Sequence, residues 1–175
     1  MVEAARRIVL LGCAGAGKTT LARRLGEGSD MPVICLDAIW RPERGGDEVE
    51  RFRALMVDAH AGDAWLSDGN FAQATFDIRL ARADLIVWLD RPRLRCAWRA
   101  IARVFRRGEA HRLKDLVKVL RFIGGFERIN RPRIEAARLA HGPDVPVVHL
   151  RKDRDVAALT EKMHKSKIAS QGQVR

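Results

Sequence analysis

A glycine-rich stretch near the start of the chain combines the residue types that bind phosphate. It fits the pattern G-x-x-x-x-G-K-[ST], the Walker A or P-loop pattern, and runs through Gly12, Cys13, Ala14, Gly15, Ala16, Gly17, Lys18, Thr19 and Thr20. Glycines let successive backbone N–H groups turn inward as an anion nest, and a following helix adds partial positive charge. Lys18 would then bridge the β- and γ-phosphates of ATP, and the Thr19 hydroxyl would ligate Mg²⁺.

The segments on either side of this stretch decide between a true P-loop and a glycine-rich turn with a chance lysine. Residues 8–11 are β-branched and aliphatic, as expected of a buried parallel strand. Residues 20–25 place Leu21 and Leu25 on one helical face, until Gly26 and Gly28 end the pattern. A strand before the loop and a helix after it favour the P-loop.

Acidic residues follow other apolar runs of the chain. Asp68 comes after residues 64–67 and is a candidate carboxylate near Mg²⁺, bound directly or through water, although Asp68-Gly69 is also typical of a plain turn. Asp37 ends the run at 33–36 and could orient an acceptor group or accept its proton, or serve as a cap. Asp90 lies just before Pro92 and is interpreted as a helix cap.

A basic helix is predicted after Asp90. Arg95, Arg99 and Arg103 are spaced i, i+4, i+8 and share one helical face. A separate apolar stripe consists of Leu94, Trp98, Ile101 and Phe105. A run of arginines is usually a solvated face, but arginines without acidic neighbours repel one another, and a bound anion would relieve that repulsion. Such groups would neutralise a phosphoryl group during its transfer.

Strands and helices alternate along the whole chain. Strands are predicted at residues 8–11, 33–37, 64–70, 85–90 and 146–150, with helical patterns at 20–25, 48–60, 94–105, 113–123, 132–141 and from 153 onward. This alternation predicts an α/β fold with a mainly parallel sheet covered on both faces. Ligands of such sheets bind outside the carboxyl ends of the strands, where the P-loop, Asp37 and Asp68 would meet.

Composition limits the class of protein. The 175 residues suit one domain, predicted over residues 1–165 with a disordered tail at 166–175. Neither a secretory leader nor an apolar run long enough for a bilayer is present, which favours a cytoplasmic protein without membrane association. Cys13, Cys35 and Cys96 lack metal-ligand spacing and are interpreted as reduced thiols.

The positive charge of the chain is concentrated in one segment. The formal net charge is +11, and residues 91–138 hold 15 Lys and Arg against 4 Asp and Glu, so this segment alone accounts for +11. Such a segment can bind polyanions, either nucleic acid or the phosphates of a nucleotide.

Several short motifs occur in an order that resembles a known group. They are Gly12–Thr20, Asp68-Gly69-Asn70, Leu89-Asp90-Arg91-Pro92 and Arg99-x-x-x-Arg103. Their order is similar to that of small P-loop kinases of the adenylate-kinase-like class. The chain looks most like the subgroup known as DNA topology modulation proteins, which has an Asp followed by Trp (Asp37 and Trp40), a Trp-x-x-Asp-Gly-Asn run (Trp65 to Asn70) and a downstream Arg such as Arg79. The resemblance spans about residues 6–150.

This resemblance implies a three-layer P-loop NTPase fold with a five-stranded parallel sheet in the order 2-3-1-4-5. It also implies ATP with Mg²⁺ and a small helical lid at about residues 99–128. Arg99 and Arg103 would contact the base and phosphates, and Asp68 would be the acid of the Asp-Gly turn. The resemblance does not extend to an AMP site, because adenylate kinases continue Asp-Gly-Phe-Pro-Arg where this chain has Asn70-Phe71-Ala72.

Three functions are compatible with these observations. The leading hypothesis is a kinase that transfers the γ-phosphate of ATP to a small acceptor such as a nucleotide or nucleoside, using Lys18, Asp68, Asp37, Arg99 and Arg103. The alternative is a nucleotide-dependent, DNA-associated regulator with weak or no kinase activity. A third is an ATPase whose chemistry is hydrolysis. The oligomeric state is left open by the sequence.

Overall fold

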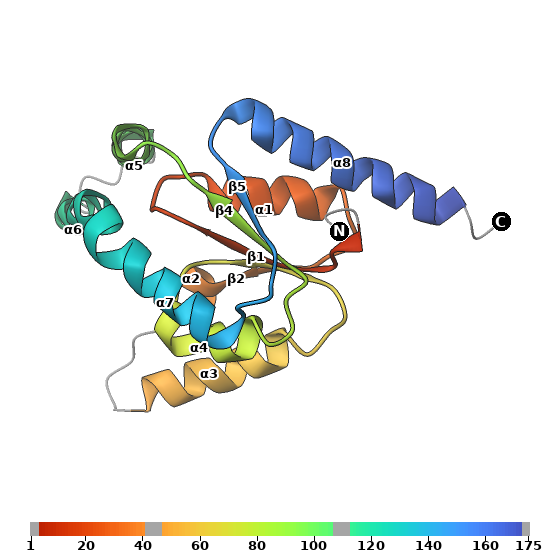
Figure 1. Cartoon of the computed structure of the whole chain (residues 1–175). Helices are drawn as coiled ribbons and strands as arrows, with labels where there is room; N and C mark the ends of the chain where they lie inside the picture. The colour runs from red at the N-terminus through yellow and green to blue at the C-terminus, as the bar shows by residue number, and fades with distance from the viewer. Residues whose placement is uncertain (1–3, 41–46, 107–112, 173–175) are drawn as a thin grey trace.

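Five parallel strands form the centre of the molecule (Figure 1). The computed structural model describes residues 4–40, 47–106 and 113–172, with backbone only at 106, 113–115 and 166–172. The strands are β1 (Arg7–Gly12), β2 (Val33–Cys35), β3 (Trp65–Asp68), β4 (Leu85–Leu89) and β5 (Val147–Leu150). Their order is β2-β3-β1-β4-β5 and every neighbouring pair is parallel, which confirms the predicted sheet.

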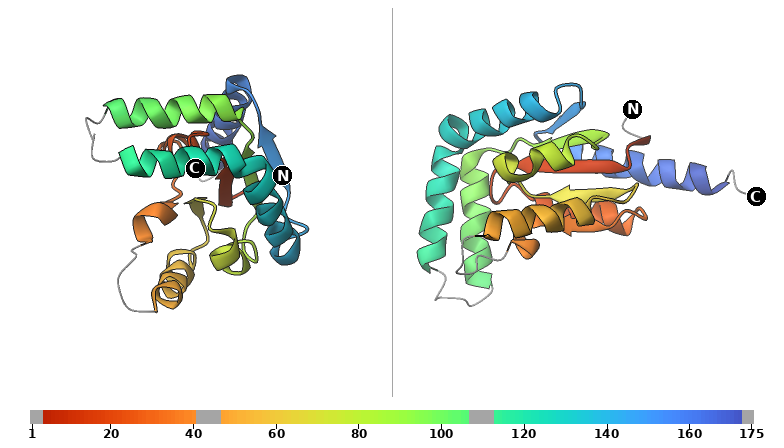
Figure 2. Two further views of the ribbon diagram at one scale, coloured as in Figure 1. Left: turned by 90° about the vertical axis from the view of Figure 1, so that its left-hand side faces the viewer. Right: turned by 90° about the horizontal axis from the view of Figure 1, so that it is seen from below.

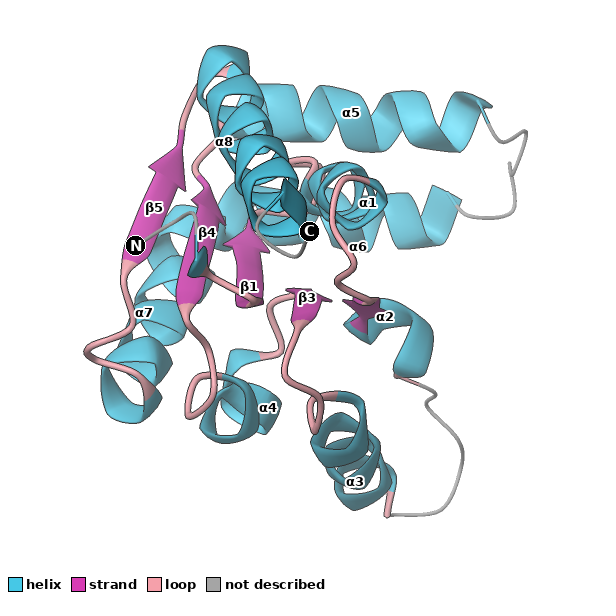
Figure 3. Ribbon diagram, turned by 90° about the vertical axis from the view of Figure 1, so that its right-hand side faces the viewer, coloured by secondary structure: helices cyan, strands magenta, loops and turns pink. Residues whose placement is uncertain are grey.

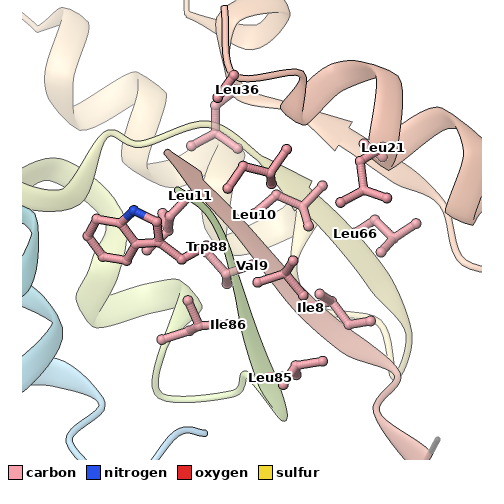
Figure 4. Packing of buried hydrophobic residues seen from close by; sticks show 14 of the residues in the cluster. Ile8, Val9, Leu10, Leu11, Leu21, Leu36, Leu66, Leu85, Ile86 and Trp88 are labelled. Atoms are coloured by element: carbon pink, nitrogen blue, oxygen red, sulfur yellow. The ribbon is translucent and has the colours of Figure 1, made fainter. Parts of the chain in front are cut away.

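The central strands are buried because helices cover both faces of the sheet. Residues Ile8 to Leu11 of β1 and Ile86 to Trp88 of β4 are fully buried. Figure 4 shows the β1 side chains packed in the core with those of Ile86 and Trp88. A strand covered on both faces needs apolar residues at successive positions rather than at alternate ones. The continuous apolar runs of the sequence therefore indicated these strands correctly.

Two groups of helices make the outer layers. On one face lie α1 (Lys18–Glu27) and α8 (Asp153–Gly172), and on the other α4 (Ala72–Arg79), α7 (Arg131–His141) and α3 (Glu48–Ala59), which packs on α4 (Figures 1 and 3). Helix α8 ends at Gly172, and the disordered tail expected at residues 166–175 stays a prediction. None of the helices in the described ranges is long and apolar enough to cross a membrane.

A pair of helices stands at the carboxyl edge of the sheet. They are α5 (Arg93–Arg106) and α6 (Leu113–Gly125), which run side by side in Figure 2. From α6 the chain passes through one π-helical stretch (Phe126–Asn130) directly into α7. This pair occupies the segment in which the resemblance implies a lid, although residues 107–112 lie outside the described part.

The apolar stripe of α5 faces away from the core. Leu94, Trp98 and Phe105 are 87%, 70% and 73% exposed, whereas Cys96 and Ala100 are buried. The reason is close packing against the P-loop: a Cβ added to Gly15 would stand 2.3 Å from the carbonyl oxygen of Cys96. Only small side chains fit on a helix face that approaches a backbone so closely.

Three local predictions differ from the structure. The second strand ends at Cys35, and Asp37 lies in the short helix α2 (Leu36–Ile39) rather than at a strand end. Helix α4 was not predicted. Asp90 was interpreted as a helix cap, but its carboxylate accepts a hydrogen bond of 2.9 Å from Nη1 of Arg131.

Candidate functional site

A cavity of about 880 Å³ opens at the carboxyl edge of the sheet. All but two of the predicted site residues line it. Those that do are Ala14, Gly15, Ala16, Gly17, Lys18, Thr19, Thr20, Asp37, Asp68, Arg99 and Arg103. The two exceptions are Gly12 and Cys13, the first two residues of the loop, which are buried. The parallel sheet thus brings residues from four separate segments of the chain to one site.

The P-loop follows a path that requires glycine. Gly15 and Gly17 have φ angles of 80° and 103°, in the region that L side chains rarely adopt. Helix α1 begins at Lys18 directly after the loop. Its first N–H groups have no partner within the helix, so the loop and the helix start together offer several donors to an anion.

Lys18 lies folded over the loop. Its Nζ donates hydrogen bonds to the carbonyl oxygens of Gly12, at 2.9 Å, and of Cys13, at 3.2 Å. Burial lowers the pKa of Lys18, while the charges of Asp68 and Asp37 oppose that shift. The ammonium group is thus held against the loop backbone, in the field of two carboxylates.

Thr19 and Asp68 are in direct contact. The Thr19 hydroxyl donates a 2.5 Å hydrogen bond to Oδ2 of Asp68, which is only 4% exposed. Burial raises the pKa of Asp68, and the hydrogen bond from Thr19 and the charge of Lys18 oppose the rise. A hydroxyl and a carboxylate at this separation are the hard oxygen donors that suit Mg²⁺.

Asn70 joins the turn after β3 to the P-loop. Its side-chain carbonyl accepts from the backbone N–H of Gly12 at 3.2 Å, and its amide nitrogen donates to the Gly12 carbonyl at 3.0 Å. The sequence placed Asn70 in a motif but gave it no role.

Arg79 is fully buried beneath the same turn. Its guanidinium donates to the carbonyl oxygens of Gly69, at 2.9 Å, and of Asn70, and to the hydroxyls of Ser67 and Thr75. Burial lowers the pKa of Arg79 to about 9, which still leaves it charged at neutral pH. Arg79 therefore holds both carbonyls of the turn that follows Asp68.

A buried histidine completes this network. Nδ1 of His60 lies 2.8 Å from the carbonyl oxygen of Met56, so this nitrogen carries the proton and Nε2 accepts from the Ser67 hydroxyl at 2.9 Å. Burial, together with the charge of Arg79, lowers the pKa of His60 to about 4. Sequence reasoning did not find His60 as part of the site's support.

Two arginines of α5 line the cavity, and a third forms an ion pair outside the P-loop. Arg99 and Arg103 line the cavity, and Nη1 of Arg99 lies 3.4 Å from the carbonyl oxygen of Ala16 in the loop. Arg95 shares their predicted face but pairs with Asp153 at 2.5 Å. Asp153 also pairs with the buried Arg91, at 2.8 Å.

Two buried thiols, those of Cys13 and Cys96, belong to the P-loop and to α5. The Cys96 thiol donates a weak hydrogen bond of 3.8 Å to the carbonyl oxygen of Arg91. The proximity of the two thiols lowers the pKa of Cys96, aided by the positive charges of Lys18 and Arg99, and raises the pKa of Cys13.

Comparisons with known proteins agree with this geometry at the level of the fold. No protein-family model and no curated protein matches the sequence. The chain is similar in structure to the shikimate kinase of Acinetobacter baumannii in complex with shikimate (TM-score 0.60, 18% identity, 99% of this chain and 97% of that one). It is also similar to the shikimate kinase of Bacteroides thetaiotaomicron (TM-score 0.58, 20% identity, 93% of this chain and 98% of that one). A third similar structure is a gluconokinase from Sinorhizobium meliloti 1021 (TM-score 0.51, 15% identity, 97% of this chain and 98% of that one).

These similarities identify the architecture. The sheet order and the surrounding helices are those of the P-loop kinase fold. Identities of 15% to 20% show the fold alone and say nothing of the acceptor of this chain.

Proposed function

We propose that this protein is an ATP-dependent kinase for a small acceptor alcohol, such as a nucleotide or nucleoside. The observation that carries the proposal is the convergence of Lys18, the Thr19–Asp68 pair, Asp37 and two arginines on one cavity. A site for hydrolysis alone would need a held water, whereas this cavity has space for a second substrate beside the loop.

The P-loop side of the cavity suits the nucleotide. Backbone N–H groups of residues 13–19 would hold the phosphates, and Lys18 would leave the Gly12 and Cys13 carbonyls to bind the β- and γ-phosphates. Thr19 and Asp68 would hold Mg²⁺, which supplies charge neutralisation when bound. Arg99 and Arg103 would add positive charge beside the transferring phosphoryl group.

Asp37 lines the same cavity as the α5 arginines. Its exposed carboxylate can accept a hydrogen bond from an acceptor hydroxyl and take its proton as the new oxygen–phosphorus bond forms. Its place in α2, one residue into the helix, keeps the carboxylate at the cavity rim. Asp37 is therefore proposed as the group that orients the acceptor.

Substitution of the P-loop lysine tests this function. We expect Lys18→Ala to reduce ATP turnover roughly 10²-fold or more, because it removes a positive charge that acts on the transferring group. The exposed Lys162→Ala on α8 is the matched control. Circular dichroism would establish that both variants keep the fold. Near-normal turnover in Lys18→Ala would refute the proposal.

A screen of acceptors separates transfer from hydrolysis. ADP release is measured with and without each candidate acceptor, using the full chain with Mg²⁺ and ATP. A kinase gives ADP release well above the rate without acceptor, together with a phosphorylated product. Equal rates with every acceptor would instead indicate an ATPase.

A second candidate function is nucleotide-dependent association with DNA. It is favoured by helix α5, which combines the 70% exposed Trp98 with arginines in a segment of charge +11. Exposed aromatic rings beside cations are typical of surfaces on which nucleic-acid bases stack. The resemblance to DNA topology modulation proteins points in the same direction.

Salt dependence tests this second candidate. Labelled duplex and single strands are titrated at two salt concentrations, with and without ATP. Binding through phosphate contacts should weaken steeply as salt rises, and Trp98→Ala should weaken binding to the single strand. Undetectable binding at low salt would leave the basic segment to the nucleotide phosphates.

A further inference from the structure

Three aromatic rings from separate elements meet beside the proposed acceptor position. Trp40 follows α2, Phe52 lies in α3, and Phe71 precedes α4. The ring centroids are 5.0 Å apart for Trp40 and Phe52, 5.2 Å for Phe52 and Phe71, and 5.9 Å for Trp40 and Phe71. We call these three residues the ring wall.

The ring wall has a buried back and a partly open front. Phe52 is only 3% exposed and packs into the core, whereas Trp40 and Phe71 are half-buried. Phe71 itself lines the cavity, together with Asp37, whereas Trp40 does not line it and packs against Phe71 with 5.9 Å between the ring centroids. The wall therefore presents ring surface beside the carboxylate that would orient the acceptor hydroxyl.

The backbone of Phe71 is strained so that its ring stands at the cavity. Its φ and ψ are 33° and 39°, and it is the single non-glycine residue with positive φ in the described part of the chain. Such a conformation is unfavourable for a bulky residue and persists where surrounding contacts enforce it, often at ligand sites. Here Asn70 is tied to Gly12, and Arg79 holds the two preceding carbonyls.

Two carboxylates that share the cavity with Phe71 disfavour an anionic acceptor beside the ring wall. They belong to Asp37 and Asp68, while the basic residues of the same cavity are Lys18, Arg24, Arg91, Arg99 and Arg103. Two arginines from the elements of the wall are engaged elsewhere. Arg53, next to Phe52, forms a two-point ion pair with Asp77 and also donates to the Ala74 carbonyl. Arg79 is buried in the turn.

We infer that the acceptor is an alcohol carried on a planar, uncharged ring system, such as a nucleoside, whose ring packs against Phe71 and Trp40 while its hydroxyl meets Asp37. This inference rests on the proposed kinase function. In the reaction the acceptor oxygen forms the new bond to the γ-phosphorus, and the bond from that phosphorus to the β–γ bridging oxygen breaks. The hydroxyl proton passes to Asp37, and ADP leaves with the bridging oxygen.

A panel of three alcohols tests the inference with the full chain. Deoxyadenosine has a planar, uncharged ring, shikimate is a cyclic carboxylate, and gluconate is an open-chain carboxylate. Turnover is followed by ADP release, and binding of each compound to the ADP-bound protein is followed by calorimetry. We expect deoxyadenosine to exceed both carboxylates by about tenfold or more, in the range that stacking of a base on an aromatic ring supplies.

Substitutions in the ring wall identify the surface responsible. Phe71→Leu and Trp40→Leu remove a ring but keep an apolar side chain, and each should weaken deoxyadenosine binding about tenfold while ATP binding is unchanged. Trp40 has an ordinary φ of −61°, so its variant remains informative if Phe71→Leu does not fold. Phe105→Leu, which is exposed and outside the cavity, is the matched control.

The outcomes separate this inference from the proposed function. Absent deoxyadenosine binding, carboxylate binding as tight as that of deoxyadenosine, or unchanged deoxyadenosine binding in both wall variants would overturn the ring-wall inference. None of these results depends on whether Lys18→Ala loses ATP turnover. A kinase that prefers shikimate would keep the proposed function and lose only the acceptor class.

Discussion

Acid should destabilise this protein through one buried histidine before its carboxylates protonate. His60 is 1% exposed and donates from Nδ1 to Met56 while Nε2 accepts from Ser67. A second proton on Nε2 would remove the acceptor that the Ser67 hydroxyl needs, beside the positive charge of Arg79. The native state therefore holds His60 neutral.

The size of the effect follows from proton linkage. The pKa of His60 falls from its ordinary 6.5 to about 4 in the folded state. Between these values the unfolded chain binds a proton that the native chain does not, so stability decreases as pH falls. At 1.36 kcal/mol per pKa unit, the loss reaches about 2 kcal/mol at pH 5 and about 3 kcal/mol at pH 4.

Urea unfolding at several pH values measures this loss. Wild type is compared with His60→Gln, because the difference between the two cancels the titration of other groups, including Asp68, whose raised pKa acts in the opposite direction. Wild type should lose about 2 kcal/mol more than the variant between pH 7 and pH 5. His141→Gln, at an exposed position, should behave as wild type. Equal pH slopes in wild type and His60→Gln would refute the reasoning.

Three further predictions concern the site and its support. Asp37→Asn should lower kcat roughly 10²-fold with little change in the KM for ATP, measured by steady-state kinetics, since the amide cannot take the acceptor proton. Asn70→Ala should lower the free energy of unfolding by about 2 kcal/mol, from two hydrogen bonds at about 1 kcal/mol each, and weaken ATP binding in calorimetry. Arg79→Lys should cost about 2–3 kcal/mol in urea unfolding, because a compact ammonium cannot reproduce the planar fork with which the guanidinium reaches both carbonyls of the turn and the hydroxyls of Ser67 and Thr75. A loss under 1 kcal/mol would contradict the role given to Arg79.

The sheet and the loop could be predicted because their signals are local. A P-loop needs glycines at fixed spacing, and a strand buried on both faces needs a continuous apolar run, so both are visible within about ten residues. The strand order has no such local signal and came from the resemblance. The strand β2 was predicted to be too long, because Leu36 is as apolar as Ile34. In the structure Leu36 is instead the first residue of helix α2.

The supporting residues of the site could not be predicted from their types. Arginine and histidine are usually exposed, and the full burial of Arg79 and His60 depends on partners brought by β3 and α4. One signal was available: Thr75 and Arg79 are spaced i, i+4 directly after the Asp-Gly-Asn turn. Likewise, helical periodicity showed an apolar stripe on α5 but could not show that Trp98 would face solvent.

The parallel pairing of β1 and β3 explains why the turn after Asp68 contains asparagine. Leu10 pairs with Asp68 in the sheet, so two positions further along the same register Gly12 stands opposite Asn70. The strand ends at Asp68, and the Asn70 side chain replaces the missing peptide by offering both an acceptor and a donor to the Gly12 backbone. An aspartate would lack the donor and would face the Gly12 carbonyl with negative charge. The carboxylate of Asp68 and the first residue of the P-loop are therefore held in register by one amide, which couples the proposed magnesium ligand to the phosphate-binding loop.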